Sequence, residues 1–194
     1  MSRHGHRRTR GFTFLEFLIV SSLLTVISGA LAEFVSQNLQ LQMLSQAQGD
    51  LRTTGYLAMN QMVTELRPAT RAAAGSPPNL TVPAAPNNTS LTFYLPEDLD
   101  GNGLIIDAAG VIEWVTDTPI QYQYDAGTKQ LRRVVAGGAT RVLANDVTQA
   151  VFKDRSIDAS LSADEVSIQL TLQRSTLNGR LVSTTVSALV KLRN

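Results

Sequence analysis

One stretch of this chain is so apolar that it leaves few options for folding. From Phe12 to Ala32 the sequence holds a single charged residue, Glu16. As a helix rising about 1.5 Å per residue, such a run spans roughly 30 Å, the thickness of a membrane's hydrocarbon core. A charge at the centre of such a span costs roughly 2.5–3.5 kcal/mol, so Glu16 requires a compensating partner. We therefore expect a transmembrane helix with a functional carboxylate near its start.

The charges that flank this run predict its orientation. Four of the 17 Lys and Arg residues precede it, namely Arg3, Arg7, Arg8 and Arg10. Acidic residues, Glu33 and then Asp50, follow it. Because positively charged flanks stay in the cytoplasm, we expect a single-pass protein with a cytoplasmic N-terminus and an exported C-terminal part.

The helical pattern continues beyond the apolar run. Apolar residues recur at helical spacing through Leu44, Ala47, Leu51, Ala58 and Met62. Arg67-Pro68 marks the end, because a residue that precedes proline is disfavoured in the α conformation. We expect one helix over residues 12–67, which crosses the membrane over 12–32 and is amphipathic over 33–67.

The rest of the chain predicts a loop followed by a β domain. Residues 68–90 are rich in Ala, Pro, Asn and Ser, a loop composition. Strand-like runs follow at 91–95, 111–116, 120–124, 130–135, 141–143, 147–152, 165–173 and 180–192. Asn178-Gly179 is typical of a tight turn between the last two. The expected fold class is therefore α+β, a long N-terminal helix packed on one antiparallel sheet over residues 91–194.

Composition argues against several function classes. The chain has no cysteine, and its two histidines, His4 and His6, both precede the apolar run. A chain processed after that leader has no thiolate or histidine for a metal site, and it has no histidine for a catalytic triad. The sequence has no stripe of Lys or Arg residues of the kind that binds nucleic acid. We therefore do not expect an enzyme or a nucleic-acid partner.

One loop motif indicates a possible cation. Asp98, Asp100 and Asn102 place oxygen ligands at alternate positions before a glycine, like the start of a calcium-binding loop. The twelfth position, which should carry a bidentate carboxylate, is Ala109, so Asp107 or Glu113 would have to substitute from another position. The two readings are a calcium site at Asp98, Asp100, Asn102 and Asp107, and a solvated turn.

The hexapeptide Gly11-Phe12-Thr13-Phe14-Leu15-Glu16 resembles the processing signal of type IV pilins and type II secretion pseudopilins. Residues 1–11 resemble the short basic leader of that family. The resemblance implies a pilin-like fold, cleavage by prepilin peptidase between Gly11 and Phe12, and methylation of the new amino group of Phe12. It further implies that this amine pairs with Glu16 of a neighbouring subunit, which would neutralise both charges within lipid.

The cysteine-free β domain that follows a Pro-rich loop looks most like minor subunits, the J-class pseudopilins and W-class minor pilins. The implied function is a minor pilin or pseudopilin that acts at the tip or in initiation of a type IV pilus or a type II secretion pseudopilus. The implied partners are prepilin peptidase, other pilin or pseudopilin subunits, an assembly platform in the inner membrane, and the lipid bilayer.

Two other interpretations remain open. Ala30-Leu31-Ala32 fits a conventional signal-peptide cleavage site, and cleavage there would release a soluble β-domain binding protein that begins at Glu33. A single-pass receptor anchored by the apolar helix would need neither Gly11 nor Glu16.

Overall fold

The computed structural model describes residues 13–69, 80–110, 112–113, 118–176 and 178–192. The chain forms two compact units, residues 1–44 and 45–194. One helix, α1 (Phe14–Leu66), contributes its first part to one unit and its last part to the other. It ends one residue before Arg67-Pro68, as the restriction on a residue that precedes proline predicts.

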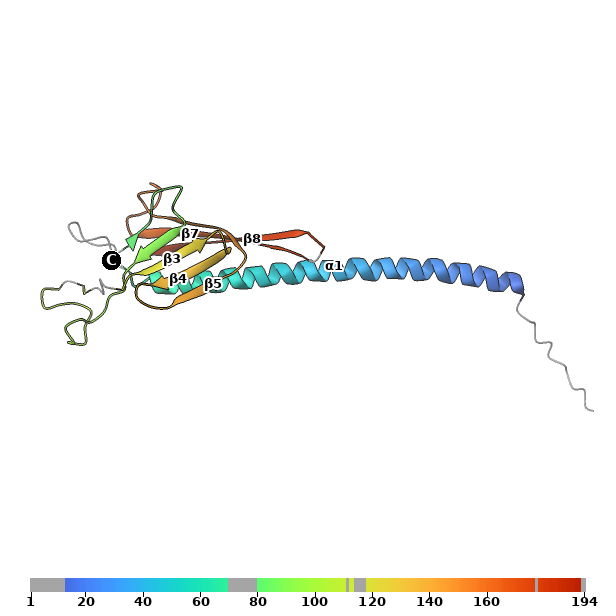
Figure 1. Cartoon of the computed structure of the whole chain (residues 1–194), viewed down its shortest axis with the longest axis horizontal. Helices are drawn as coiled ribbons and strands as arrows, with labels where there is room; N and C mark the ends of the chain where they lie inside the picture. Colours follow the sequence, from blue (N-terminus) through green and yellow to red (C-terminus); the bar gives the residue numbers. More distant parts are fainter. Residues whose placement is uncertain (1–12, 70–79, 111, 114–117, 177, 193–194) are drawn as a thin grey trace, which may run out of the picture. The chain divides into compact units, whose positions relative to one another are not determined.

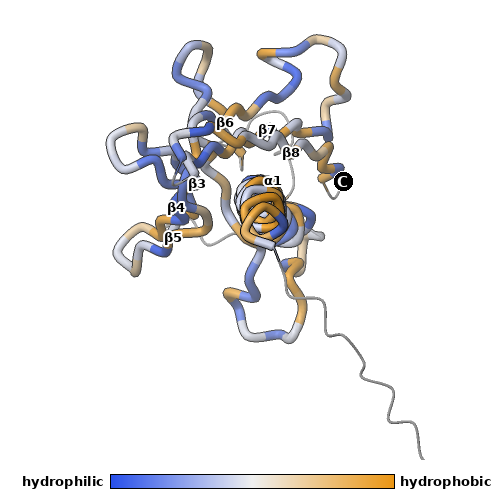
Figure 2. Tube along the Cα trace, turned by 90° about the vertical axis from the view of Figure 1, so that its right-hand side faces the viewer, coloured by the Kyte–Doolittle hydropathy of each residue, from blue (hydrophilic) through white to orange (hydrophobic). Residues whose placement is uncertain are grey.

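The first part of α1 is apolar and exposed. From Thr13 to Asp50 no side chain is buried. Figure 2 views this part end-on, and most of it is coloured as hydrophobic. The helix is long and apolar enough to cross a membrane. The predicted transmembrane segment is therefore helical, and the described residues of this unit bury none of their side chains.

The second unit carries two antiparallel sheets (Figure 1). The first sheet has the order β1-β2-β3-β4-β5, and its strands are β1 (Leu80–Thr81), β2 (Ser90–Phe93), β3 (Ile120–Asp125), β4 (Gln130–Val135) and β5 (Thr140–Ala144). The second has the order β6-β7-β8, and its strands are β6 (Val147–Lys153), β7 (Glu165–Ser175) and β8 (Leu181–Lys191). The α+β layout of a long N-terminal helix packed on antiparallel strands is confirmed.

The sheets differ from the sequence expectation in two respects. A single sheet was expected, but the strands divide into two because β5 and β6 do not pair. Residues 68–90 were expected to be a loop, but Leu80–Thr81 pairs with β2 as a short strand that buries Leu80. The strand expected over 111–116 lies mostly outside the described residues, and Ile112 within it forms a single bridge with Ile106.

Hydrogen bonds join the two sheets along β6. The amide of Phe152 donates to the carbonyl oxygen of Asn88 at 2.9 Å, and the Asn88 side chain donates back to the Phe152 carbonyl at 3.2 Å. The Val147 amide donates to the Lys129 carbonyl at 2.9 Å. The edge of β6 that faces the first sheet is thus capped by polar partners, which an exposed strand edge otherwise lacks.

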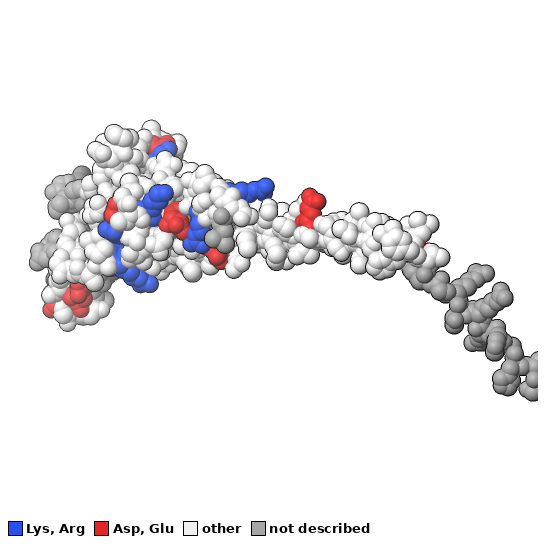
Figure 3. Space-filling view, turned by 45° about the vertical axis from the view of Figure 1, so that its right-hand side comes forward, with Lys and Arg blue, Asp and Glu red and all other residues white. Residues whose placement is uncertain are grey.

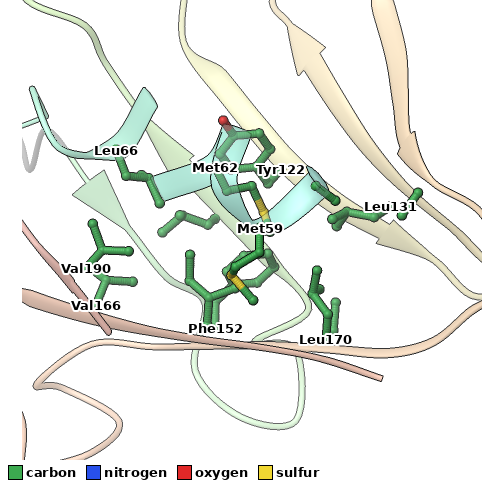
Figure 4. Close-up of a cluster of buried hydrophobic side chains, with 14 of the residues drawn as sticks. Met59, Met62, Leu66, Tyr122, Leu131, Phe152, Val166, Leu170 and Val190 are labelled. Atoms are coloured by element: carbon green, nitrogen blue, oxygen red, sulfur yellow. The ribbon is translucent and has the colours of Figure 1, made fainter. Parts of the chain in front are cut away.

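The last part of α1 fills the space between the two sheets. Its buried residues are Leu51, Gly55, Ala58, Met59, Met62 and Leu66. Figure 4 shows Met59, Met62 and Leu66 pointing into a cluster of side chains from both sheets, among them Tyr122 and Phe152. The helix and the two sheets therefore share one hydrophobic core, and β3–β5 and β6–β8 lie on different sides of α1 (Figure 2).

Gly55 permits the closest approach of α1 to the second sheet. A Cβ atom at this position would lie 2.9 Å from Cγ2 of Val186 on β8 and 3.2 Å from Cδ1 of Leu172 on β7. The helix packs on the sheet here because glycine has no side chain. Gly49, one residue before Asp50 on the same helix, faces open space, with no atom within 4 Å of such a Cβ.

Candidate functional site

The start of α1 holds Glu16 in a hydrogen-bonded arrangement with Thr13. The Thr13 amide donates to Glu16 Oε2 at 3.0 Å, and the Thr13 hydroxyl donates to the same oxygen at 3.1 Å. The Glu16 amide in turn donates to Thr13 Oγ1 at 3.3 Å. This reciprocal pattern is a capping box, which satisfies amide groups that a helix N-terminus leaves without partners.

The capping box is a role for Glu16 that the sequence analysis missed. Its signal is present, because Thr13 and Glu16 have the spacing Thr-x-x-Glu immediately before an apolar run. Thr13 supplies hydrogen bonds but no positive charge, so a neutralising partner is still required if the carboxylate lies in lipid. The predicted partner, the amine of Phe12, and the predicted cleavage residue Gly11 lie outside the described residues.

The loop from Glu97 to Glu113, here named the acidic loop, contains the predicted cation ligands. Asp98 is held by backbone amides: Gly103 donates to Oδ2 at 2.7 Å, and Gly101 donates to Oδ1 at 2.8 Å. These hydrogen bonds, that from Gly103 foremost, lower the pKa of Asp98 from its usual value. The Leu99 amide donates to Oε2 of Glu113 at 2.6 Å, which brings the two ends of the loop together.

The carboxylates that lie close together in this loop differ from the predicted set of cation ligands. Oxygen atoms of Asp98, Asp100 and Glu113 lie within 4.8 Å of one another, whereas Asp107 is not in this group and accepts a hydrogen bond from the Ala109 amide. The amide nitrogen of Asn102 donates to Asp100 Oδ2 at 2.8 Å, whereas its Oδ1, the atom predicted as a ligand, accepts a hydrogen bond from the Leu104 amide at 2.7 Å. The three carboxylates supply oxygen ligands of the type that Ca²⁺ prefers, and the calcium site stays a prediction.

A second polar cluster lies between α1 and the first sheet. Oε2 of Glu65 accepts a hydrogen bond from the Tyr122 hydroxyl at 2.8 Å and from Nε of Arg133 at 2.7 Å, and Gln61 donates to Oε1 at 3.0 Å. Burial raises the pKa of Glu65, but the hydrogen bonds from Arg133, Gln61 and Tyr122 outweigh it, so the pKa is lowered.

The same burial raises the pKa of the Tyr122 hydroxyl, and its hydrogen bond to Glu65 adds to the effect. Tyr122 is therefore neutral at physiological pH, and it donates to Glu65 while its ring fills the core beside Phe93, at a centroid distance of 5.4 Å. This cluster anchors the helix to the sheet. Sequence reasoning did not find it, because its members are separated by 57 and 68 positions.

Comparisons with protein-family models, with curated proteins and with solved structures found no match to this chain.

Proposed function

We propose that this chain is a minor pilin or pseudopilin, a structural subunit that prepilin peptidase processes and that assembles from the inner membrane into a type IV pilus or a type II secretion pseudopilus. One observation carries the proposal: an exposed apolar helix begins with a single carboxylate, Glu16, five positions after the Gly11 of a pilin-type processing motif.

The exposure of α1 beyond its expected membrane span supports a role in assembly over a role as a simple anchor. An anchor needs only an apolar span, whereas here the helix remains exposed beyond Ala32, through Phe34, Leu39, Leu41 and Met43. A membrane does not cover these residues if the span ends near Ala32, so helices of other subunits are their natural partners. Figure 3 shows few charged atoms along this part of the helix, as helix-to-helix packing requires.

The continuity of α1 favours pilin processing over secretory cleavage. The helix runs without interruption through Ala30, Leu31 and Ala32. Cleavage after Ala32 would cut within a regular helix and leave the exposed apolar residues 34–43 on a soluble product. Among the described residues of the first unit, none is buried and none lies in a strand.

Mass spectrometry of the mature N-terminus tests the proposal directly. A chain that begins with N-methylated Phe12 is expected. A chain that begins at Glu33 would show secretory cleavage, and one that retains Met1 would show an unprocessed anchor. Either of these results would overturn the proposal.

A further inference from the structure

The outer edge of β8 is a long row of backbone groups that no described strand covers. β8 is the last strand of the sheet β6-β7-β8 (Figure 2), and its 11 residues pair with β7 on one side only. At one end of this pair the Thr176 amide donates to the Arg180 carbonyl at 2.8 Å, and at the other end Leu192 donates to the Asp164 carbonyl at 2.7 Å. The even-numbered residues of β8 therefore bond to β7. Because bonded and non-bonded positions alternate along an antiparallel pair, the odd-numbered residues of β8 turn their amides and carbonyls toward the free edge.

The other sheet edges in the described part of the chain carry features that discourage the addition of a strand. β1 has only two residues, and β5 exposes Arg141 and has a register shift where it pairs with β4. The edge of β6 is capped by its hydrogen bonds with Asn88 and Lys129. β8 has none of these features, because it pairs with β7 without a register shift and residues 181–190 include no charged residue and no proline. An edge of this kind pairs readily with another chain, and folded proteins rarely leave one exposed.

The charge at this edge indicates which kind of strand fits it. Arg180 directly precedes β8, is exposed, and forms no ion pair with a described residue. The other basic groups nearby have partners: Arg174 lies 2.7 Å from Asp146, and Lys191 lies 3.6 Å from Asp164. The positive charge left unpaired at the edge is therefore that of Arg180, and a carboxylate on an added strand would neutralise it.

We infer that an extended segment of a different polypeptide adds to β8 and places a carboxylate beside Arg180. Main-chain bonds to the odd-numbered residues supply the affinity of such an addition, and side chains supply its selectivity. A second copy that pairs through its own β8 does not fit, because residues 180–192 contain no Asp or Glu. An antiparallel pair would bring the Lys191 end of one copy to the Arg180 end of the other, and a parallel pair would place Arg180 beside Arg180.

The inference rests on the proposed function for one point, that the different polypeptide is another subunit of the same filament. A tip or initiation subunit contacts subunits of other kinds, and an edge that accepts a different chain agrees with that role. Leu181 and Leu189 add selectivity, because they are 67% and 59% exposed on the outer face of β8. Apolar side chains opposite these two residues would form cross-strand pairs with them.

Amide exchange of the full chain in detergent micelles, followed by NMR, tests strand addition directly. The probe is a synthetic peptide of alternating Val and Thr with glutamates at both ends, and the control peptide has lysines at both ends. We expect the glutamate peptide to slow exchange of the Ser183, Thr185 and Ser187 amides about tenfold or more, and to change little at the even-numbered amides. Equal protection by both peptides, or by neither, would overturn the inference. Protection that appears without peptide as the chain is concentrated would show pairing between copies and would also overturn it.

Two variants at one position test the contribution of the backbone. Thr185→Pro removes one amide that faces the free edge and no bond to β7, and proline is tolerated at such edge positions. Thr185→Val keeps the amide and the shape of the side chain. We expect the proline variant to bind the glutamate peptide about tenfold more weakly and the valine variant to bind it as the wild type does. Slow exchange at the even-numbered amides will show that the proline variant is folded, and equal binding by the two variants would overturn the inference.

Charge reversal tests the choice of partner without altering the backbone. Arg180→Glu should weaken binding of the glutamate peptide about fivefold at low salt and strengthen binding of the lysine peptide. Arg141→Glu reverses the charge of an exposed arginine on β5 and should change neither affinity. If Arg180→Glu left the preference between the two peptides unchanged, the charge complementarity that identifies the partner would be refuted.

Incorporation into filaments in the producing cells separates this inference from the proposed function. Thr185→Pro should be processed to N-methylated Phe12 but incorporated less than Thr185→Val. Normal processing with equal incorporation of both variants would overturn the inference and leave the proposed function standing. A mature chain that begins at Glu33 would overturn both.

Discussion

Replacing Gly55 by alanine tests the packing of α1 against the second sheet. In a helix interior alanine is favoured over glycine by about 1 kcal/mol. Here the new Cβ would lie 2.9 Å from Cγ2 of Val186, and a valine side chain cannot turn away easily because it is stiff about χ1. Overpacking of this kind costs about 1–3 kcal/mol. Taking about 2 kcal/mol, we expect Gly55→Ala to lower the free energy of unfolding by about 1 kcal/mol.

Gly49→Ala is the matched control on the same helix. It gains the same helix propensity, and nothing lies within 4 Å of its Cβ position, so we expect about 1 kcal/mol of stabilisation. For a unit of about 150 residues, each kcal/mol shifts the Tm by about 2–4 °C. Thermal unfolding of the full chain in detergent micelles, followed by circular dichroism, should therefore show shifts of about 3 °C in opposite directions.

Combining Gly55→Ala with Val186→Ala identifies the clash as the cause. The shortened side chain removes the contact at 2.9 Å, so alanine at position 55 should cost less in this background, with a coupling energy of about 1–2 kcal/mol in a double-mutant cycle. If Gly55→Ala raised the Tm as much as Gly49→Ala does, α1 would not approach the sheet as closely as described, and the reasoning would be refuted.

Three further predictions concern charged groups and processing. Glu65→Gln should lower the free energy of unfolding by about 1 kcal/mol at pH 7. Because the folded pKa of Glu65 is lowered, its contribution to stability is present above its unfolded pKa, near 4.3, and is lost as pH falls through the folded value. The urea midpoints of variant and wild type should therefore converge at acidic pH, and a constant gap between them would contradict this. Glu16→Ala should leave the chain in the membrane fraction but reduce its incorporation into filaments. Thr13→Ala removes only the capping hydroxyl and should reduce filament incorporation less. Equal losses from the two variants would assign the loss of incorporation to capping alone. Gly11→Ala should slow removal of the leader on immunoblots, and unchanged processing would count against the pilin-type signal.

Local patterns made much of the fold predictable. The 3.6-residue period and Arg67-Pro68 were sufficient to place α1 and its end, because both signals act within a few residues. The alternation of Val166, Ile168 and Leu170 was sufficient to place β7, since one face of that strand is buried and the other is wet.

Features that depend on distant partners were not predictable in the same way. Whether β5 pairs with β6 is decided by packing around α1 and not by the strands themselves, so one expected sheet became two. The Glu65 cluster needs Tyr122 and Arg133 beside the helix, which only the folded arrangement provides. The proximity of Glu113 to Asp98 likewise depends on how the acidic loop closes, whereas the spacing along the chain pointed equally to Asp107.

The placement of buried residues along α1 has a practical consequence for work on this protein in water. Every side chain that α1 buries lies at or after Leu51, and the first compact unit ends at Leu44. Truncation before Ser45 would therefore remove the exposed apolar part of α1 and keep all the α1 residues that are buried between the sheets. Such a fragment should be soluble without detergent. A cut after Leu66 would instead leave the two sheets without the α1 side chains of their shared hydrophobic core.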